Sequence, residues 1–237
     1  MQALILNSGK GTRMGDLTKS QPKCMTRLNG EETILSHQIK QLEQLDIDEI
    51  VITTGYLSDV LKAYVKTLRT TIPITFVHNP LFETTNYIYS MALAQEYITS
   101  DVIMMHGDLV FDQDVLQSVL NYNQSCGVIS STSLLPDDDF KANITHSGDI
   151  THISTKLKSH AYAFQPLYKL LKKDWDAWLK QIKTYELNNN LTIYAEDALN
   201  DILPEVSLMA VDVKSKLCSE IDTIDDLNTI KLHLRKG

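Results

Sequence analysis

The chain has few cysteines and no long apolar run. Its three cysteines, Cys24, Cys126 and Cys218, lie far apart and form no CxxC pair. This spacing argues against a disulfide framework or a zinc site and favours free thiols in a reducing compartment. No stretch approaches the roughly 18 apolar residues that a membrane span requires, and the apolar start at Met1–Leu6 is too short for a secretion signal. We therefore expect a cytoplasmic protein that does not interact with a membrane.

Positive charge is also scarce. The formal net charge is −8, with 22 Lys and Arg against 30 Asp and Glu. A protein that binds duplex nucleic acid or an anionic membrane needs a basic footprint, so we expect no nucleic-acid partner. The net charge does not exclude a small anionic ligand, because a local cluster of Lys and Arg can hold one. The length of 237 residues suits one well-buried domain.

Short apolar runs alternate with longer amphipathic segments up to about residue 135. The expected strands are 2–7, 49–54, 74–78, 101–106 and 126–132, and the expected helices are 33–45, 57–68, 85–97 and 113–122. Such alternation is typical of βα units on a mostly parallel sheet.

The pattern changes from about Pro136. It predicts a short hairpin over 143–154, strands over 161–164 and 206–213, and helices over 167–183, 195–203 and 223–235. No repeat, low-complexity tract or linker separates this part from the first. We therefore predict one α/β domain over residues 1–237, Rossmann-like, with a mostly parallel central sheet flanked by helices.

The loop after the first predicted strand is the most informative segment. It reads Leu6-Asn7-Ser8-Gly9-Lys10-Gly11-Thr12-Arg13-Met14 and is followed by Ser20-Gln21-Pro22-Lys23. A glycine-rich loop at this place directs backbone N–H groups into the crevice where such folds bind nucleotides. Arg13 and Lys23 add the positive charge that a triphosphate requires. The loop is neither a dinucleotide fingerprint, which needs glycine at position 14, nor a Walker A loop.

The pattern GxGTRM…SxPK resembles the nucleotidyltransferase superfamily that activates sugar phosphates, phosphocholine and phosphonates as nucleotide conjugates. Two further segments, Ile47–Leu57 and Thr85–Ala94, resemble bacterial phosphocholine and 2-aminoethylphosphonate cytidylyltransferases. The resemblance implies a fold of the nucleotide-diphospho-sugar transferase type. It also implies nucleotide binding by Leu6, Asn7, Ser8, Gly9, Lys10, Gly11, Thr12, Gly55, Tyr56, Asn86 and Ser90. The alternative for Asn86 is a structural role at a helix N-terminus.

Two aspartates match the metal-binding positions of this superfamily. Asp108 follows a nearly continuous apolar strand, and Asp222 lies in the late segment Glu220–Leu227. The resemblance implies that both hold a catalytic Mg²⁺, while Lys23 and Arg13 are the catalytic cations. For Asp222 the alternative is a helix N-cap partnered by the residue three positions on.

The acceptor site is expected in the second half of the chain. Glu196 and Asp197 fall where the phosphocholine branch has acidic residues near its cationic head group, and Tyr162 supplies an aromatic face. The glycine common before the related strand is missing, since Ser159-His160-Ala161-Tyr162 stands there. The acceptor is therefore left open among phosphocholine, 2-aminoethylphosphonate and related amine or amide phosphates.

These observations predict a Mg²⁺-dependent nucleotidyltransferase of the cytidylyltransferase type (EC 2.7.7). It would transfer CMP from CTP to a small phosphorylated or phosphonylated metabolite and release pyrophosphate. Residues 1–135 would form the nucleotide-binding half, and residues 136–237 the acceptor-binding half and a closing helix. The alternatives are a sugar-1-phosphate nucleotidyltransferase using UTP or dTTP and a non-catalytic nucleotide-sensing module. The expected partners are CTP or another NTP and the acceptor, and a homodimer is left open.

Overall fold

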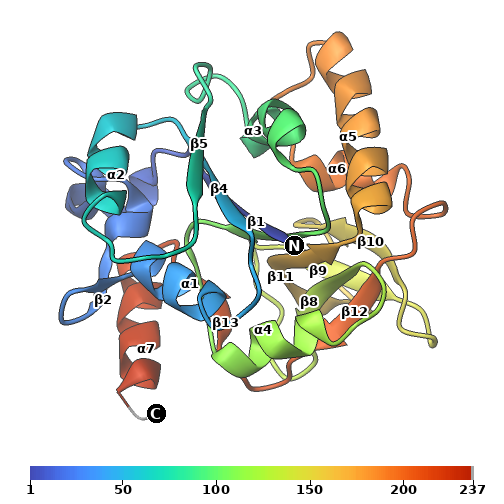
Figure 1. Ribbon diagram of the computed structural model, residues 1–237. Coiled ribbons are helices and arrows are strands. Elements are labelled where there is room, and N and C mark those ends of the chain that lie inside the picture. The colour runs from blue at the N-terminus through green and yellow to red at the C-terminus, as the bar shows by residue number, and fades with distance from the viewer. Residues whose placement is uncertain (236–237) are drawn as a thin grey trace.

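A nine-stranded sheet forms the centre of the computed structural model, which describes residues 1–235 (Figure 1). The strands are β1 (Gln2–Asn7), β4 (Glu49–Thr54), β5 (Ile74–His78), β6 (Val102–His106), β8 (Cys126–Ser130), β9 (Lys141–Ile144), β10 (Ile150–Ser154), β11 (Tyr162–Leu170) and β12 (Met209–Asp212). The main path runs β10-β9-β11-β6-β1-β4-β5, with β8 paired to β11 and β12 to β8. The strands β6, β1, β4 and β5 are parallel to one another, whereas β11 is antiparallel to all three of its neighbours.

Helices cover both faces of this sheet because side chains along each strand alternate between the faces. The helices are α1 (Ile34–Leu42), α2 (Ser58–Val65), α3 (Tyr87–Ala94), α4 (Gln113–Leu120), α5 (Lys172–Leu187), α6 (Ala195–Asn200) and α7 (Ile224–Leu234). On β1, Leu4 and Leu6 join a core with α3, α5 and α6, while Ala3 and Ile5 join a core with α1, α2 and α4. The predicted fold class, a mostly parallel sheet flanked by helices, is confirmed.

A third, smaller core holds the C-terminal helix against the first loop. Met14 of the loop, Val110, and Leu227 and Ile230 of α7 are buried together. The loop itself contains two 3₁₀ helices, η1 (Thr12–Thr18) and η2 (Lys23–Met25), and a third, η3 (Gln95–Tyr97), follows α3. In Figure 1, α7 lies close to the small sheet of β2 (Arg27–Asn29) and β3 (Glu32–Thr33), and it packs on β2. This packing brings the residues just before α7 close to Lys23.

The boundary between strand and helix near residue 170 differs from the prediction. A strand was expected over 161–164 and a helix over 167–183, but β11 continues to Leu170 and α5 begins only at Lys172. Residues 167–170 pair with β6 along their length. The register toward β8 shifts between Gln165 and Tyr168, where Pro166 has no N–H to donate. The helix prediction for 167–170 was wrong because long-range pairing overrides local spacing.

Besides β2 and β3, two more short strands were not predicted. β7 (Leu109–Phe111) pairs with β13 (Cys218–Glu220) in a separate two-stranded sheet. The predicted hairpin over 143–154 is confirmed by the antiparallel pair of β9 and β10. Among the described residues, no helix is both long and apolar enough to cross a membrane.

Candidate active site

A cavity of about 800 Å³ opens where β1 and β6 end. Carboxyl ends of parallel strands are the usual ligand-binding edge of an open α/β sheet. The cavity wall contains these predicted site residues: Leu6, Asn7, Ser8, Gly9, Gly11, Thr12, Arg13, Lys23, Asn86, Ser90, Asp108 and Asp222. The structure therefore brings together residues more than 200 positions apart.

The other predicted residues lie outside this wall. Lys10 is paired at the surface with Glu83, 2.6 Å away. Tyr162 lies on β11, next to β9. The remaining ones are Gly55, Tyr56, Glu196 and Asp197.

Gly55 and Tyr56 contact the backbone of the first loop at Ser8. A Cβ atom at Gly55 would lie 2.4 Å from the Ser8 carbonyl oxygen, so no side chain fits there. The Tyr56 amide donates to the same oxygen, at 3.3 Å. The loop is thus packed directly on the end of β4.

A chain of buried polar groups fixes the start of the loop. The amide of Asn79 donates to Ser90 Oγ at 3.0 Å, and Ser90 donates to Ser8 Oγ at 2.9 Å. Ser8 in turn donates to Thr53 Oγ1 at 3.1 Å. Ser8 is thus held directly by α3 and β4, and Asn79, just after β5, holds Ser90 in turn.

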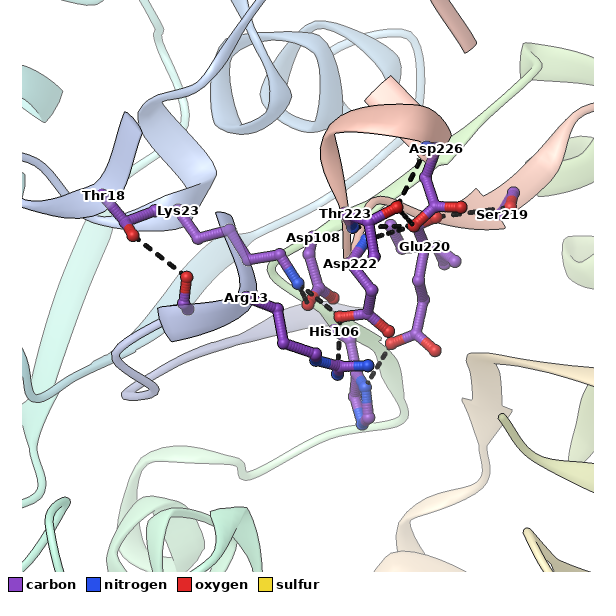
Figure 2. Close-up of polar contacts among 12 residues, drawn as sticks. Arg13, Thr18, Lys23, His106, Asp108, Ser219, Glu220, Asp222, Thr223 and Asp226 are labelled. Carbon is purple, nitrogen blue, oxygen red and sulfur yellow. Dashed lines mark hydrogen bonds and ion pairs between the residues drawn. The ribbon is translucent and has the colours of Figure 1, made fainter. Parts of the chain in front are cut away.

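Gly11 allows the loop to pass over Lys23. Its φ is +63°, a conformation that residues with a side chain rarely adopt. An added Cβ would also lie 2.9 Å from the Cβ of Lys23. The Thr18 hydroxyl donates to the Gly11 carbonyl at 3.0 Å (Figure 2), which stabilises the turn.

Four charged side chains, which we call the charged centre, meet at one end of the cavity. They are Arg13, Lys23, Asp108 and Asp222. Lys23 Nζ lies 2.6 Å from both Asp108 Oδ2 and Asp222 Oδ1, and Arg13 Nη2 lies 2.8 Å from Asp222 Oδ1 (Figure 2). These contacts connect the first loop, the end of β6 and the segment before α7.

The protonation of this centre follows from its charges. Burial lowers the pKa of Lys23, but the charges of Asp108 and Asp222 outweigh this and raise the pKa above its ordinary value. Burial alone would raise the pKa of Asp108, yet Lys23 and His106 hold it below its usual range. The lysine is therefore charged, and the Asp108 carboxyl is ionised.

Asp222 is not the N-cap of α7. Thr223 is, because its hydroxyl accepts from the Asp226 amide while the Asp226 carboxylate accepts from the Thr223 amide. The alternative interpretation of Asp222 as the N-cap was therefore wrong, because the cap is the next residue. The Asp222 carboxylate instead contacts Lys23 and Arg13. Asn86, by contrast, does cap α3, since its side chain accepts from the Tyr87 amide at 2.8 Å.

The site contains buried polar atoms that have no hydrogen-bond partner among residues 1–235: Asn7 Nδ2, His106 Nε2 and Asp108 Oδ1. Such atoms are costly in a folded protein unless a ligand or solvent satisfies them. Ligand atoms of His106, Asp108 and Glu220 also lie within 4.8 Å of one another. Asp108 and Glu220 offer carboxylate oxygens, the ligand type that Mg²⁺ prefers, whereas His106 offers a ring nitrogen. The carboxylates of this site, Asp222 included, therefore fit a divalent cation.

His106 and Glu220 form a pair beside this centre, with His106 Nδ1 at 2.8 Å from Glu220 Oε1. Burial lowers the pKa of His106, but its bond to Glu220 and the surrounding carboxylates raise the pKa to about 9. Burial and the Asp108 charge raise the pKa of Glu220 above its ordinary range. Both side chains lie at the cavity wall, beside Asp108.

Three aromatic rings, which we call the aromatic wall, line another part of the cavity. Tyr194 lies 6.2 Å from Tyr87 and 5.0 Å from Phe140, measured between ring centroids. Behind them, the buried Glu196 carboxyl accepts from the hydroxyls of Tyr87 and Tyr168, the second at 2.7 Å. Burial, together with the Glu196 charge, raises the pKa of Tyr87 well above its ordinary value.

Sequence reasoning missed several wall residues. They are Tyr87, Phe140, Thr155, Lys156 and the acidic run Asp137, Asp138 and Asp139. Tyr87 had a signal, since it directly follows Asn86 in the segment that carries the family resemblance. No local sequence signal indicated Phe140 or Lys156, because it is the pairing of β9, β10 and β11 that places them at the cavity wall.

A family model described as a MobA-like NTP transferase domain matches residues 3–135, more than half of the chain. The chain is 26% identical to the CTP:phosphoglutamine cytidylyltransferase of Campylobacter jejuni, over 96% of this chain and 98% of that one. It is 23% identical to the choline-phosphate cytidylyltransferase of Haemophilus influenzae, over 97% and 96%. The solved structure of the CTP:phosphocholine cytidylyltransferase from Streptococcus pneumoniae has a TM-score of 0.80, with 98% of each chain covered and 18% identity. This last likeness concerns the fold.

Proposed function

We propose, from the premise that this chain belongs to the MobA-like NTP transferase family and is a nucleotidyltransferase, that it transfers CMP from CTP to a small phosphorylated or phosphonylated metabolite. The observation that carries the proposal is Lys23, held between Asp108 and Asp222 on the wall of a cavity that the glycine-rich loop enters. The choice of CTP is supported by the names of the relatives that match over nearly the whole chain.

The proposed reaction requires positioning and charge more than proton transfer. A phosphate or phosphonate oxygen of the acceptor is already an anion at neutral pH, so it needs no general base. In the proposal, backbone N–H groups of the loop from Ser8 to Thr12 hold the triphosphate. Lys23 and Arg13 stabilise the charge that develops on the α-phosphate and the departing pyrophosphate. Both cations already lie at the cavity wall.

Asp108 and Asp222 are the proposed holders of Mg²⁺. When bound, the ion supplies charge neutralisation and orients the nucleotide phosphates. The unpartnered Asp108 Oδ1 supports this assignment, because a buried carboxylate oxygen needs a partner. Lys23 bridges the same two carboxylates in the structure, so its ammonium holds them together before the cation enters.

The acceptor is proposed to lie between the charged centre and the aromatic wall, mostly among residues of the second half, 136–237. Tyr87, Phe140 and Tyr194 offer ring faces, and the carboxylates of Asp137 to Asp139 stand on the same cavity. Aromatic faces and carboxylates together favour a positively charged or strongly polar nitrogen group. We therefore propose a phosphate or phosphonate that carries an amine or amide.

The test is pyrophosphate release with Mg²⁺, for CTP, UTP, ATP, GTP and dTTP against four kinds of acceptor: phosphocholine, 2-aminoethylphosphonate, an amide phosphate such as phosphoglutamine, and glucose-1-phosphate. We expect turnover with CTP and one amine- or amide-bearing acceptor. Turnover only with glucose-1-phosphate and UTP or dTTP would instead identify a sugar-1-phosphate enzyme. No turnover with any combination would contradict the proposal and favour a nucleotide-sensing role.

A matched pair of variants tests the metal assignment. Asp108→Ala should abolish turnover in a protein that remains folded. Asp114→Ala is the control, because Asp114 is exposed on α4 and its carboxylate pairs with the surface residue Lys216, at 3.4 Å. Full activity of Asp108→Ala would overturn the metal assignment.

A further inference from the structure

A buried glutamine on α1 contacts the turn that carries Asp108. Gln38 is completely buried, and its Nε2 lies 2.8 Å from the carbonyl oxygen of His106 and 2.8 Å from that of Leu109. A glutamine amide has two N–H donors, and Gln38 uses both here. Because the two carbonyls flank Gly107 and Asp108, one side chain spans the whole turn between β6 and β7.

Backbone groups also hold the main chain of this turn. The Gly107 amide donates to the Leu6 carbonyl at 3.0 Å, and the Ile221 amide donates to the Asp108 carbonyl at 3.0 Å. A Cβ atom at Gly107 would lie 1.8 Å from Asn7 Oδ1, so the turn is packed tightly against the first loop. Within residues 1–235, Gln38 is the side chain that donates to the carbonyls of the turn.

We propose that Gln38 is a positioning residue for the cation site: it clamps the turn and thereby fixes the Asp108 carboxylate opposite Asp222. The proposal rests on the proposed function, in which these two carboxylates hold Mg²⁺. Gln38 itself does not line the cavity, so it acts only through the turn. Packing alone does not require an amide at this position, since a leucine or methionine would fill the same space. The two hydrogen bonds to buried carbonyls therefore indicate a role beyond packing.

The physical reason lies in the two carbonyls. Without Gln38 they are buried and lack a donor, which is unfavourable. The turn then gains by moving toward solvent or toward other donors, and the Asp108 carboxylate moves with it. Groups that hold metal ligands in place change metal affinity by about 10–100-fold when they are removed.

The experiment measures cation binding directly, with Mn²⁺ as the spectroscopic probe and CTP present. Electron paramagnetic resonance gives the free Mn²⁺ in a titration that needs neither acceptor nor turnover. Gln38→Met removes both donors and nearly conserves the volume. Gln41→Met is the matched control, because Gln41 is a buried glutamine on the same helix whose amide, among residues 1–235, contacts only His37, at 3.5 Å.

We expect Gln38→Met to weaken Mn²⁺ binding by about 10–100-fold, whereas Gln41→Met should bind as tightly as the wild type. The Michaelis constant for CTP should change little in Gln38→Met, while kcat falls. If Gln38→Met does not fold, Gln38→Asn carries the same expectation, since its amide is too short to reach both carbonyls.

Equal Mn²⁺ affinity of the wild type and the Gln38 variant would overturn the positioning role and leave the proposed function intact. Equal weakening in the Gln38 and Gln41 variants would also overturn it, since a general packing effect would then explain the loss. A wild type that binds no Mn²⁺ in the presence of CTP would overturn both the positioning role and the proposed metal site.

Discussion

The charged centre and the aromatic wall use charge in opposite ways. In the charged centre, Lys23 contacts both Asp108 and Asp222 at the cavity wall, where a ligand reaches them. Behind the aromatic wall, the carboxyl of Glu196 is buried and already accepts two tyrosine hydroxyls. Charges at the cavity wall act on a ligand directly, whereas a buried, satisfied carboxyl acts by fixing the rings in front of it. Variants of the charged centre should therefore lose mainly activity, whereas variants of the aromatic wall should lose mainly stability.

The largest effect is expected in the charged centre, for Lys23→Met. Loss of one preorganised cation typically lowers kcat by about 10²–10³-fold. The variant also leaves Asp108 and Asp222 close together without the cation that bridges them, so Mg²⁺ should raise its melting temperature more than that of the wild type. Pyrophosphate release and thermal melting with and without Mg²⁺ check both expectations.

Lys19→Met is the control for this comparison. Lys19 lies in the same loop, but it is exposed and its ammonium pairs with the equally exposed Asp16, at 2.6 Å. Its removal should leave kcat unchanged. A kcat of Lys23→Met close to that of the wild type would show that the charged centre does not act on the phosphates.

In the aromatic wall, we expect the main loss to be in stability. Glu196→Leu leaves the hydroxyls of Tyr87 and Tyr168 buried without their acceptor, which costs about 2–4 kcal/mol of unfolding free energy. Glu196→Gln keeps an acceptor and should cost about 1 kcal/mol. Urea unfolding gives both values. Equal stability of the leucine variant and the wild type would mean that the two hydroxyls find other partners.

The same pair of variants sharpens the kinetic contrast with Lys23. Because Tyr87 and Tyr194 form one wall, displacement of Tyr87 should raise the Michaelis constant for the acceptor in Glu196→Leu. The Michaelis constant for CTP should change little. An equal rise for both substrates would argue that the aromatic wall is not confined to the acceptor.

The charged centre could be predicted from the sequence, and most of the aromatic wall could not. Asp108 follows a short strand whose apolar spacing is a local signal. Lys23 lies in the loop after another such strand, and the family resemblance then supplied the proposed roles of both residues. Phe140 lies beside Tyr194 only because β9 and β11 pair. Such pairing depends on residues far apart in the chain, which local patterns do not record.

The errors of detail have the same physical origin. Residues 167–170 have spacing that suits a helix, yet they pair with β6 as part of β11. Gln38 appeared only as one position of an amphipathic helix, because its two carbonyl partners follow it by about 70 residues. The fold class was predictable because alternating strands and helices are a local property, whereas specific polar contacts across the fold are not.

A smaller effect is expected at the acidic run that faces the cavity. Lys141 is buried, and its Nζ donates to the carbonyls of Pro136 at 2.7 Å and Asp137 at 2.9 Å. Lys141→Met releases this segment and should cost about 1–2 kcal/mol of stability. Because the released segment carries Asp137 to Asp139, the Michaelis constant for the acceptor should rise several-fold.

Lys169→Met is the matched control for Lys141. Lys169 is also a buried lysine that donates to two carbonyls, those of Leu120 and Tyr122, but it lies outside the cavity wall. Lys169→Met should lose a similar free energy of unfolding, without any change in the Michaelis constant for the acceptor. If both lysine variants raise this constant equally, the acidic run has no specific role in acceptor binding.

The smallest effect is expected outside both regions, at Asp212. Burial raises the pKa of this carboxyl, but hydrogen bonds from the hydroxyl and amide of Ser131 and the amide of Lys214 outweigh it, so the pKa lies below its ordinary value. A lowered pKa in the folded state stabilises the protein above the unfolded-state pKa of about 3.9, and this contribution is lost as pH falls through the folded-state value. Since Asp212 is exposed, solvent screening limits it to roughly 0.5 kcal/mol. Urea unfolding of Asp212→Asn should therefore show a small deficit at pH 7 that shrinks below about pH 4, with kcat unchanged. A deficit that is the same at both pH values would mean that hydrogen-bond geometry, and not the carboxylate charge, joins β12 to the end of β8.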